Sequence, residues 1–218
     1  MKKLSSVGVA LLFISVSTVA YAQNLIQNGS FELPGFTGNA VPGQQQRVVA
    51  YSTDITGWTV GGIGDVYVHE YPVGPASSFG PAEDGSYYLD LSGDGPPHAT
   101  VYQDFSTIPG LQYSLKFYIG SSSYSSGQTI NVTLSEDTQV NLLNTTLTPL
   151  APSGNINWLE ETFTFTADMN TTRLSFVDTS GFDDNASYVD NVSVTEVPEP
   201  ATLLPIGLVA LAWWRRRR

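Results

Sequence analysis

A regular alternation of apolar and polar residues constrains the fold of this chain more than any other feature. In Leu111–Ile119, apolar side chains occupy every second position, and polar or amphipathic side chains lie between them. The segments 130–135 and 162–166 repeat the pattern. A period of two is typical of antiparallel strands that bury one face. The sequence between the two chain ends shows no convincing helical period, so it predicts an all-β fold.

Shorter segments and turn signals extend this prediction to the rest of the folded region. The further expected strands are 24–26, 31–33, 47–51, 58–60, 65–69, 87–91, 100–105, 174–176 and 188–194. Pro109-Gly110 and Asp168-Met169-Asn170 are turn signals between strands. We therefore expect an antiparallel β-sandwich in which each sheet buries one face and exposes the other.

The first 22 residues have the organisation of a secretory signal peptide. Lys2 and Lys3 precede an apolar run over residues 7–19, and Ala20-Tyr21-Ala22 supplies small residues at a cleavage position. We predict export through the Sec translocon, with cleavage after Ala22. The folded domain is then residues 23–197, a length that suits one domain with a full core.

The last 21 residues, 198–218, form a second targeting segment with three parts. Pro198, Glu199 and Pro200 make a stiff turn that stops any preceding strand. Residues 201–214 carry no charge and end in two tryptophans, and we expect them to form a short transmembrane helix. The chain ends in four arginines, namely Arg215, Arg216, Arg217 and Arg218.

This arrangement of a Pro-Glu-Pro triplet, a short apolar segment and an arginine cluster resembles the PEP-CTERM sorting tail of Gram-negative bacteria. The resemblance implies recognition by an exosortase, a membrane protease or transpeptidase that cuts near the triplet. It also implies delivery of the folded domain to the cell surface or the exopolysaccharide matrix. An ordinary tail anchor is the alternative.

The folded region is strongly acidic. Its basic residues are Arg47, Lys116 and Arg173, against 19 acidic residues, so the net charge of residues 23–197 is −16. Nucleic-acid binding depends on neutralising phosphates with Lys and Arg, so this charge argues against a nucleic-acid partner and against an anionic membrane surface. It favours divalent cations and neutral partners. The chain has no cysteine, so disulfides and thiol chemistry are excluded.

Five short motifs occur in order along the folded region. They are residues 24–32 (Asn-Leu-Ile-Gln-Asn-Gly-Ser-Phe-Glu), 56–60, 84–91, 109–113 and 188–194 (Tyr-Val-Asp-Asn-Val-Ser-Val). In this order they resemble the jelly-roll domains of the galactose-binding-like superfamily, most closely the DUF642-type domain and more distantly carbohydrate-binding modules of families 4, 9 and 22. The resemblance implies a jelly-roll sandwich that binds glycan. Plant-wall DUF642 proteins commonly have two such domains and cysteines, whereas this chain has one domain and none.

Asp190 is the most informative polar residue, because alternation places it on one strand face with Val192 and Val194. A carboxylate that faces a core is costly unless it is paired or bound to a metal. The resemblance implies that Glu32 and Asp190 together hold a structural Ca²⁺, with backbone carbonyls and waters completing six to eight oxygen ligands. The alternatives are a hydrogen-bonded or exposed aspartate, or an ion pair with Arg173.

No pattern in the sequence predicts catalysis. The two histidines, His69 and His98, lack the spacing of a zinc site, and we expect them in exposed loops. No Gly-x-Ser-x-Gly frames a serine nucleophile. Adjacent carboxylates such as Glu160-Glu161 point to opposite faces of a strand, so they do not form a glycosidase pair. We therefore predict no catalytic residue.

Exposed tyrosines are the remaining candidates for glycan contact, because aromatic faces bind sugars. By alternation or loop position these are Tyr67, Tyr71, Tyr102, Tyr118 and Tyr124. Asp104 or Gln103 would supply polar contacts beside such a platform. Trp58 and Trp158 stand where strands begin, a position that favours the core.

Taken together, these patterns predict an exported, non-catalytic protein of the cell surface or biofilm matrix, held transiently in the inner membrane and released by exosortase. Binding of an extracellular polysaccharide is the expected activity. A purely structural protein of the biofilm or floc matrix, or a polysaccharide hydrolase, is the alternative.

Overall fold

A computed structural model describes residues 23–35, 45–49, 51–71, 80–94, 97–121, 127–136, 140–151, 154–180 and 186–198. These residues contain the strands β1 (Gln45–Val49), β2 (Thr59–Gly61), β3 (Asp65–Glu70), β4 (Tyr87–Asp90), β5 (Thr100–Ser106), β6 (Gln112–Ser121), β7 (Ile130–Glu136), β8 (Val140–Leu147), β9 (Leu159–Thr166), β10 (Thr171–Asp178) and β11 (Ser187–Glu196). The signal peptide, Tyr124, Glu199, Pro200, the apolar segment 201–214 and the four arginines lie outside the described residues.

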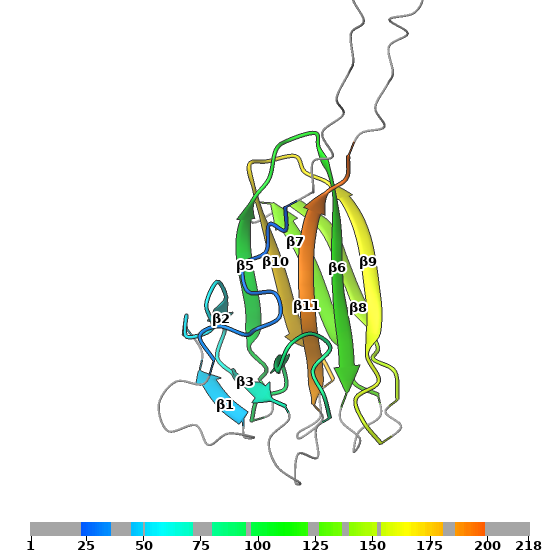
Figure 1. Cartoon of the computed structure of the whole chain (residues 1–218). Coiled ribbons are helices and arrows are strands. Elements are labelled where there is room, and N and C mark those ends of the chain that lie inside the picture. Colours follow the sequence, from blue (N-terminus) through cyan, green and yellow to red (C-terminus); the bar gives the residue numbers. More distant parts are fainter. Residues whose placement is uncertain are drawn as a thin grey trace, which may run out of the picture.

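The strands form two antiparallel sheets that pack face to face (Figure 1). A six-stranded sheet has the order β1-β3-β4-β11-β6-β9, and a five-stranded sheet has the order β2-β5-β10-β7-β8. In Figure 1, β11, β6 and β9 lie in front of β5, β10, β7 and β8. The prediction of an all-β sandwich is therefore confirmed for the described part of the chain.

The core lies between the sheets and is built by the predicted alternation. On β6, Leu115, Phe117 and Ile119 are fully buried, and the residues between them face outward. Trp58 is also fully buried, and its indole nitrogen donates to the Asn28 carbonyl oxygen at 3.0 Å. Among the described residues, the core extends from Ile26 to Val194.

The predicted face of Asp190 is wrong because β11 contains a bulge. The register against β6 shifts between Asp190 and Ser193, and Asn191 has a left-handed φ of 48°. One extra residue moves every following side chain to the opposite face. Val192 and Val194 therefore enter the core, whereas Asp190 lies on the outer face of the six-stranded sheet, in register with Tyr118.

Two further expectations about strands are wrong. Strand β8 was not predicted, because its adjacent Leu142 and Leu143 break the alternation where the β7–β8 register shifts. The predicted strands at 24–26 and 31–33 are irregular segments that end in bends. In the first of them, the Asn24 side-chain oxygen accepts from the Ile26 and Val194 amides and takes the place of regular strand pairing.

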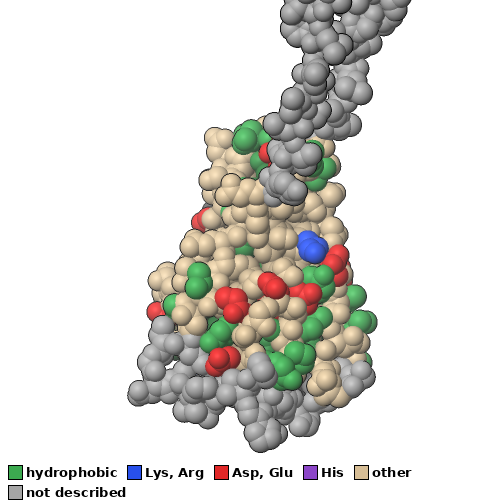
Figure 2. Space-filling model, viewed as in Figure 1, with side chains coloured by type: hydrophobic (Ala, Val, Ile, Leu, Met, Phe, Trp, Pro, Cys, Tyr) green, Lys and Arg blue, Asp and Glu red, His purple; other side chains and the backbone are tan. Residues whose placement is uncertain are grey.

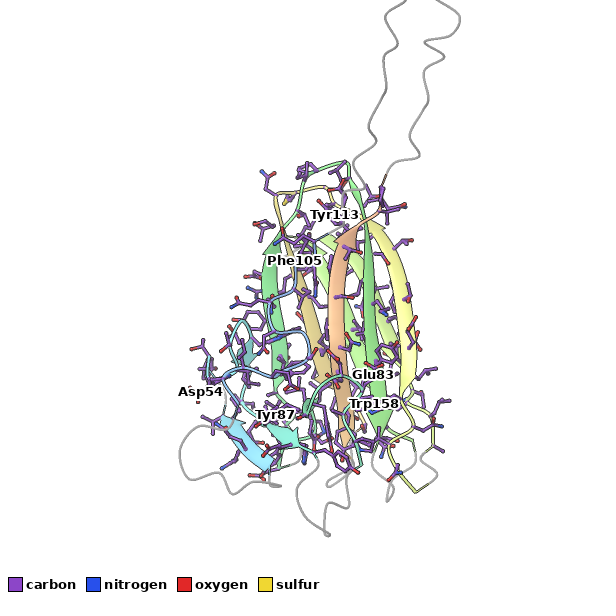
Figure 3. All side chains as sticks on the ribbon, in the orientation of Figure 1. Asp54, Glu83, Tyr87, Phe105, Tyr113 and Trp158 are labelled. Carbon is purple, nitrogen blue, oxygen red and sulfur yellow. The ribbon has the colours of Figure 1, made fainter. Side chains whose placement is uncertain are left out.

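Both ends of the described chain lie at one end of the sandwich, which we call the tail pole (Figure 1). The Leu25 amide donates to the Val194 carbonyl at 2.8 Å, and the Val197 amide donates to the Gln112 carbonyl at 2.8 Å. The opposite end, which we call the far pole, carries Trp158, whereas Tyr113 lies near the tail pole (Figure 3). No helix among the described residues is long and apolar enough to span a membrane.

Candidate functional site

The outer face of the five-stranded sheet carries rows of small polar side chains in register. One row crosses all five strands and joins Thr59, Tyr102, Ser175, Thr133 and Asn144. The neighbouring row joins Asp104, Arg173, Ser135 and Asn141. Strand spacing of about 4.8 Å makes this a regular array of hydroxyl and amide groups. Such an array can donate and accept hydrogen bonds along an extended ligand.

Arg173 is the organising side chain of this face. Its Nε and Nη2 atoms donate to the two carboxylate oxygens of Asp104 at 2.6 and 2.7 Å. Its guanidinium carbon lies 4.0 Å from the centroid of the Tyr102 ring. The hydrogen bond to Asp104 raises the pKa of Arg173 above its ordinary value. The result is a rigid, partly exposed plane whose charge is neutralised by its own partner.

Tyr102 owes its position to a glycine on the neighbouring strand. A Cβ atom added to Gly61 on β2 would lie 3.0 Å from Cε1 of Tyr102, so a larger residue would crowd the ring. Arg173 covers one face of the same ring. The predicted partnership of Tyr102 with Asp104 is therefore present on this face. Gln103, the other predicted partner, points inward and bonds to the backbone of Gln27.

An open pocket of about 640 Å³ borders the ion pair at the tail pole. Asp104 and Arg173 form its floor together with Ser135 from the end of β7. Pro109 and the segment 168–171 form its walls. Its volume lies within the range of small-molecule sites, and six of its eight lining residues are polar or charged.

A buried carboxylate fixes the wall of this pocket. Glu136 is fully buried at the end of β7, and both of its carboxylate oxygens accept from the Asp168 amide, at 3.1 and 2.9 Å. The Thr172 hydroxyl donates to the same carboxylate at 3.0 Å. Thr107 adds a bond to the Met169 carbonyl at 2.8 Å. No pattern in the sequence indicates this role, because it depends on the packing of β7 against the β9–β10 loop.

The two outer faces of the sandwich differ in charge. Among the described residues, the two rows on the five-stranded sheet contain only the neutralised pair of Asp104 and Arg173 as charged groups. On the six-stranded sheet, acidic side chains gather across the lower half of the face, with a basic side chain beside them (Figure 2). The first face therefore suits an uncharged ligand better than the second does.

The other candidate tyrosines do not share the platform of Tyr102. Tyr67 and Tyr118 lie on the outer face of the six-stranded sheet, where their hydroxyls donate to Asp94 and Glu160 respectively. The hydrogen bond to Glu160 raises the pKa of Tyr118 to about 12. Tyr71 follows β3, and its amide donates to the Ser86 carbonyl at 2.7 Å. The candidates are therefore divided between opposite faces.

His69 lies in a buried aromatic cluster and not in an exposed loop as expected. Its side chain is almost fully buried on β3, and its ring stacks on Tyr88 with centroids 5.2 Å apart. Its Nε2 lies 3.0 Å from a carboxylate oxygen of Asp90. Trp158 packs edge-on against Tyr88 at 5.7 Å. The cluster holds loops of the far pole onto the six-stranded sheet, away from the pocket.

Glu32 and Asp190, the predicted calcium ligands, both bind the same short segment of backbone. Oε1 of Glu32 accepts from the Ser86 and Tyr87 amides at 2.7 and 2.8 Å. Oδ2 of Asp190 accepts from the Glu83 and Asp84 amides at 2.8 and 3.0 Å. Both carboxylates thus bind the backbone of residues 83–87. The predicted pairing of Asp190 with Arg173 is wrong, since Arg173 pairs with Asp104 on the other sheet.

Backbone amides surround the Asp190 carboxylate, because Oδ2 accepts from the Glu83 and Asp84 amides and Oδ1 accepts from the Asn191 amide. The Asp190 side chain is fully buried, and no salt bridge joins it to another described residue. Burial raises the pKa of Asp190 to about 8, although three backbone amides oppose this shift. The described residues contain no group of three or more His, Cys, Asp or Glu side chains that could hold a metal by themselves. Backbone oxygens and waters would therefore have to complete any calcium shell.

Comparison with known proteins gives a family and a shared fold. The family described as "Protein of unknown function (DUF642)" matches residues 24–195. No curated protein matches the chain. The structure resembles that of TmCBM61 in complex with β-1,4-galactotriose, with a TM-score of 0.53 and 15% identity over 81% of this chain and 100% of the other.

Two further similar structures carry lower scores. A structure titled "CBM4 structure and function" has a TM-score of 0.46 and 21% identity over 79% of this chain and 99% of the other. The CBM22-1 xylan-binding domain of Paenibacillus barcinonensis Xyn10C has a TM-score of 0.47 and 13% identity over 74% of this chain and 99% of the other. The similarity with TmCBM61 shows that the two proteins share a fold.

Proposed function

We propose, on the premise that this chain belongs to the DUF642 family, that it binds glycan without catalysing a reaction on it. The binding site is the outer face of the five-stranded sheet together with the pocket at the tail pole. The observation that carries this proposal is the Arg173 guanidinium, fixed by Asp104 and Tyr102 beside an open polar pocket. A planar donor group held in place before binding costs little entropy when it engages sugar hydroxyls.

The charge of the site favours a neutral glycan over an acidic one. The two guanidinium nitrogens of Arg173 that bond Asp104, Nε and Nη2, are already committed to that carboxylate. Asp168 adds a second carboxylate to the pocket lining. A uronic acid would therefore meet two negative charges and one neutralised cation, a combination that costs binding energy. Neutral hydroxyls, in contrast, can donate to Asp104 and accept from Ser135 and Asn170.

A paired titration tests this function. The segment 23–198 is titrated by calorimetry with β-1,4-galactotriose, the neutral sugar present in the similar TmCBM61 structure, and with trigalacturonate as the acidic counterpart. We expect saturable binding of the neutral sugar and at least about tenfold weaker binding of the acidic one, a difference of ~1.4 kcal/mol. The proposal would be contradicted if the protein bound neither sugar and bound no glycan on an array of neutral glycans. The alternative, a structural matrix protein without a discrete site, predicts this absence of binding.

We also propose that the chain is exported and processed as its ends suggest. The signal peptide directs it through the Sec translocon, and the segment 198–218 holds it in the inner membrane until an exosortase releases it to the cell surface or matrix. The support is the order of sequence features at residues 1–22 and 198–218. Intact-mass measurement of the extracellular protein from wild-type and exosortase-deficient cells tests this. Release of the unprocessed chain from both strains would contradict it.

A structural Ca²⁺ held by Glu32 and Asp190 is a third part of the proposal. Its support is a fully buried carboxylate whose ionised form lacks a cationic partner among the described side chains. The cation would supply that charge, and the two side chains would hold residues 83–87 in place around it.

A further inference from the structure

We propose that Tyr51 forms a second aromatic contact for glycan at the β2 edge of the five-stranded sheet, so that the site takes an extended stretch of a polysaccharide. This inference rests on the proposed function, and it concerns the length of chain that the same site binds. It follows from a tyrosine whose backbone is strained and whose ring is exposed at the end of the polar rows.

Tyr51 occupies a backbone position that usually requires glycine. Its amide donates to the Val60 carbonyl at 2.6 Å, and the Val60 amide donates to the Ser52 carbonyl at 2.9 Å. Two residues thus lie opposite one residue of β2, as in a β-bulge whose first residue is left-handed. The φ of Tyr51 is 53–64° away from no allowed alternative but lies at 64°, in the left-handed region that a residue with a Cβ adopts at a cost.

The other left-handed residues are explained by the contacts of their side chains. Besides Tyr51, the described non-glycine residues with a positive φ are Asn28, Phe31 and Asn191. Asn28 bonds nearby backbone through both the oxygen and the nitrogen of its side-chain amide, and Asn191 donates to a carboxylate at 2.6 Å. Phe31 is buried in the core.

The Tyr51 side chain has no such structural role among the described residues. Its exposed fraction is 78%, and its ring makes no hydrogen bond or aromatic contact with another described residue. Backbone strain that the surrounding contacts do not explain is typical of functional positions. The exposed ring is therefore the feature of this residue that requires a ligand.

The ring lies where the outer face of the five-stranded sheet ends. β2 is an edge strand of this sheet, and residues 51–52 are bonded to the side of β2 that faces away from β5 (Figure 1). A ring directed into the core would be buried, as the Val60 side chain is, so its exposure places the ring of Tyr51 outside the core. A ligand that crosses the sheet from β5 over β2 therefore meets Tyr51 next.

Small residues separate Tyr102 from Tyr51 on this path. The outward positions of β2 are Thr59 and Gly61, because Val60 between them is buried. The Tyr102 ring leans over β2, since its Cε1 lies 3.0 Å from the position of a Cβ atom on Gly61. The row through Thr59 thus reaches the edge without a large β2 side chain between the two tyrosines. A tyrosine ring, apolar on its faces and polar at its hydroxyl, suits a sugar unit at that point.

The length of the path sets the length of the ligand. Arg173 pairs with Asp104, whereas the residues at the edge lie opposite Val60, which pairs with Val101. Three strand spacings of ~4.8 Å and three residues of ~3.4 Å give a diagonal of ~17 Å. A trisaccharide seated in the pocket occupies part of this path, whereas a hexasaccharide can cover all of it.

Three substitutions separate the ring from the backbone strain. Tyr51→Phe keeps both, Tyr51→Ala removes the ring and keeps the strain, and Tyr51→Gly removes both. Each full-length variant is titrated by calorimetry with β-1,4-galactotriose and with β-1,4-galactohexaose. We expect Tyr51→Ala and Tyr51→Gly to bind the hexasaccharide about fivefold more weakly, or ~1 kcal/mol, and the trisaccharide within about twofold of the unmodified protein. Tyr51→Phe should bind both sugars like the unmodified protein.

Thermal unfolding measures the strain independently of any sugar. Tyr51→Gly should melt about 3 °C above Tyr51→Ala, because glycine adopts a left-handed backbone without a steric cost. Equal melting temperatures would contradict the strain on which the inference depends. A melting temperature of Tyr51→Ala more than about 3 °C below that of the unmodified protein would show that the ring stabilises the fold, and would also overturn the inference.

The outcomes separate this inference from the function on which it rests. Unchanged hexasaccharide affinity in Tyr51→Ala would overturn the inference and leave the proposed function intact. Failure of the unmodified protein to bind either sugar would overturn the proposed function, and the inference with it. Sedimentation of the same samples covers the other occupant of an exposed ring, a second copy of this chain. A dimer that Tyr51→Ala dissociates would assign the ring to a contact between copies and overturn the inference.

Discussion

Arg173 concentrates most of the proposed binding chemistry in one side chain. Its two bonds to Asp104 and its position over Tyr102 fix the plane of the guanidinium, and Ser135 lies beside it in register. Lysine would keep the charge but lose both the planar fork and the stacking on Tyr102. A residue that looks like an ordinary surface cation in the sequence is thus held by contacts from two neighbouring strands.

We predict that Arg173→Lys weakens binding of β-1,4-galactotriose about tenfold, or ~1.4 kcal/mol, in a calorimetric titration. Arg47→Lys is the matched control, because Arg47 also bonds two aspartates, Asp65 and Asp94, but lies on the six-stranded sheet. The control should bind like the unmodified protein. An equal loss in both variants would place the effect in general stability and not in the site.

Asp190 links stability to pH and to calcium. Burial raises its pKa to about 8 in the folded protein, from an ordinary value of 3.8. Between these two values the folded protein binds a proton that the unfolded chain does not. Without a metal, the free energy of unfolding therefore falls as pH rises through this window, by up to ~1.4 kcal/mol per pH unit. A bound cation would favour the ionised carboxylate and reverse this loss.

We predict that Ca²⁺ in excess raises the melting temperature at pH 8 by at least about 3 °C, which corresponds to ~1 kcal/mol for a domain of this size. The rise should be smaller at pH 5, where protons compete, and absent in Glu32→Gln and Asp190→Asn. Glu160→Gln, an exposed carboxylate on the same sheet, should respond like the unmodified protein. If EDTA leaves the melting temperature unchanged at pH 8, the calcium proposal fails.

Single residues were predictable only where the strand itself fixes their neighbours. Tyr102 and Asp104 stand two positions apart on β5, so alternation alone places them on one face. Arg173 joins them through the β5–β10 register, which the sequence does not contain. His69 was expected in a loop, because the stacking with Tyr88 and Tyr188 that buries it comes from two other strands.

At the scale of elements, the turn at residues 28–31 is hydrogen-bonded to the last strand, β11. The Val192 amide donates to the Gly29 carbonyl at 2.9 Å, next to the bulge of β11. A Cβ atom added to Gly29 would lie 1.9 Å from the Val192 carbonyl oxygen, which is backbone and cannot move aside easily. The turn at residues 28–31 therefore requires glycine for close approach.

We predict that Gly29→Ala lowers the free energy of unfolding by about 3 kcal/mol in urea denaturation, because the backbone must shift and lose its bond. Gly127→Ala is the comparison. Gly127 has a φ of +90°, but its Cβ would meet no atom within 4 Å, so only the left-handed backbone costs energy, about 1 kcal/mol. Equal losses in the two variants would show that close approach at Gly29 is not the cause.

The loop 168–171, which lines the pocket, is held in place by the buried Glu136 side chain. Replacing Glu136 by glutamine keeps one acceptor oxygen for the Asp168 amide and Thr172 but turns an amide donor toward the same groups. We predict that Glu136→Gln lowers the affinity for β-1,4-galactotriose about fivefold, or ~1 kcal/mol, together with the melting temperature. Glu160→Gln should change neither. A lower melting temperature with unchanged affinity would mean that the loop 168–171 does not contact the ligand.

The elements that were predicted are those whose pattern is uninterrupted. β6, β7, β9 and β10 keep a period of two, and their expected faces are buried as predicted. β8 was missed and the face of Asp190 was misplaced for the same reason, since each strand contains an irregularity at which the alternation changes phase. Such irregularities depend on the partner strand, and a single sequence does not show the partner.

At the scale of the whole molecule, the resemblance found in the sequence matches the family that the comparison gives, and the sandwich is the expected one. The sequence could not show that the chain ends and the pocket share one pole, because that requires the order of strands in both sheets. It also could not show that Arg173 neutralises Asp104 on the face with Tyr102. Both facts come from the assembled fold, and both support placing the proposed glycan site on the outer face of the five-stranded sheet.

The most direct test of the central claim compares one tyrosine from each outer face. Tyr102→Ala removes the ring under Arg173, and Tyr118→Ala removes a half-buried tyrosine of the six-stranded sheet that also lies near a cation, Lys116. The dissociation constant for β-1,4-galactotriose is measured for both variants, with thermal unfolding as a check that each is folded. We predict a loss of at least about tenfold for Tyr102→Ala and an unchanged constant for Tyr118→Ala. The reverse result, with binding lost only in Tyr118→Ala, would contradict the account.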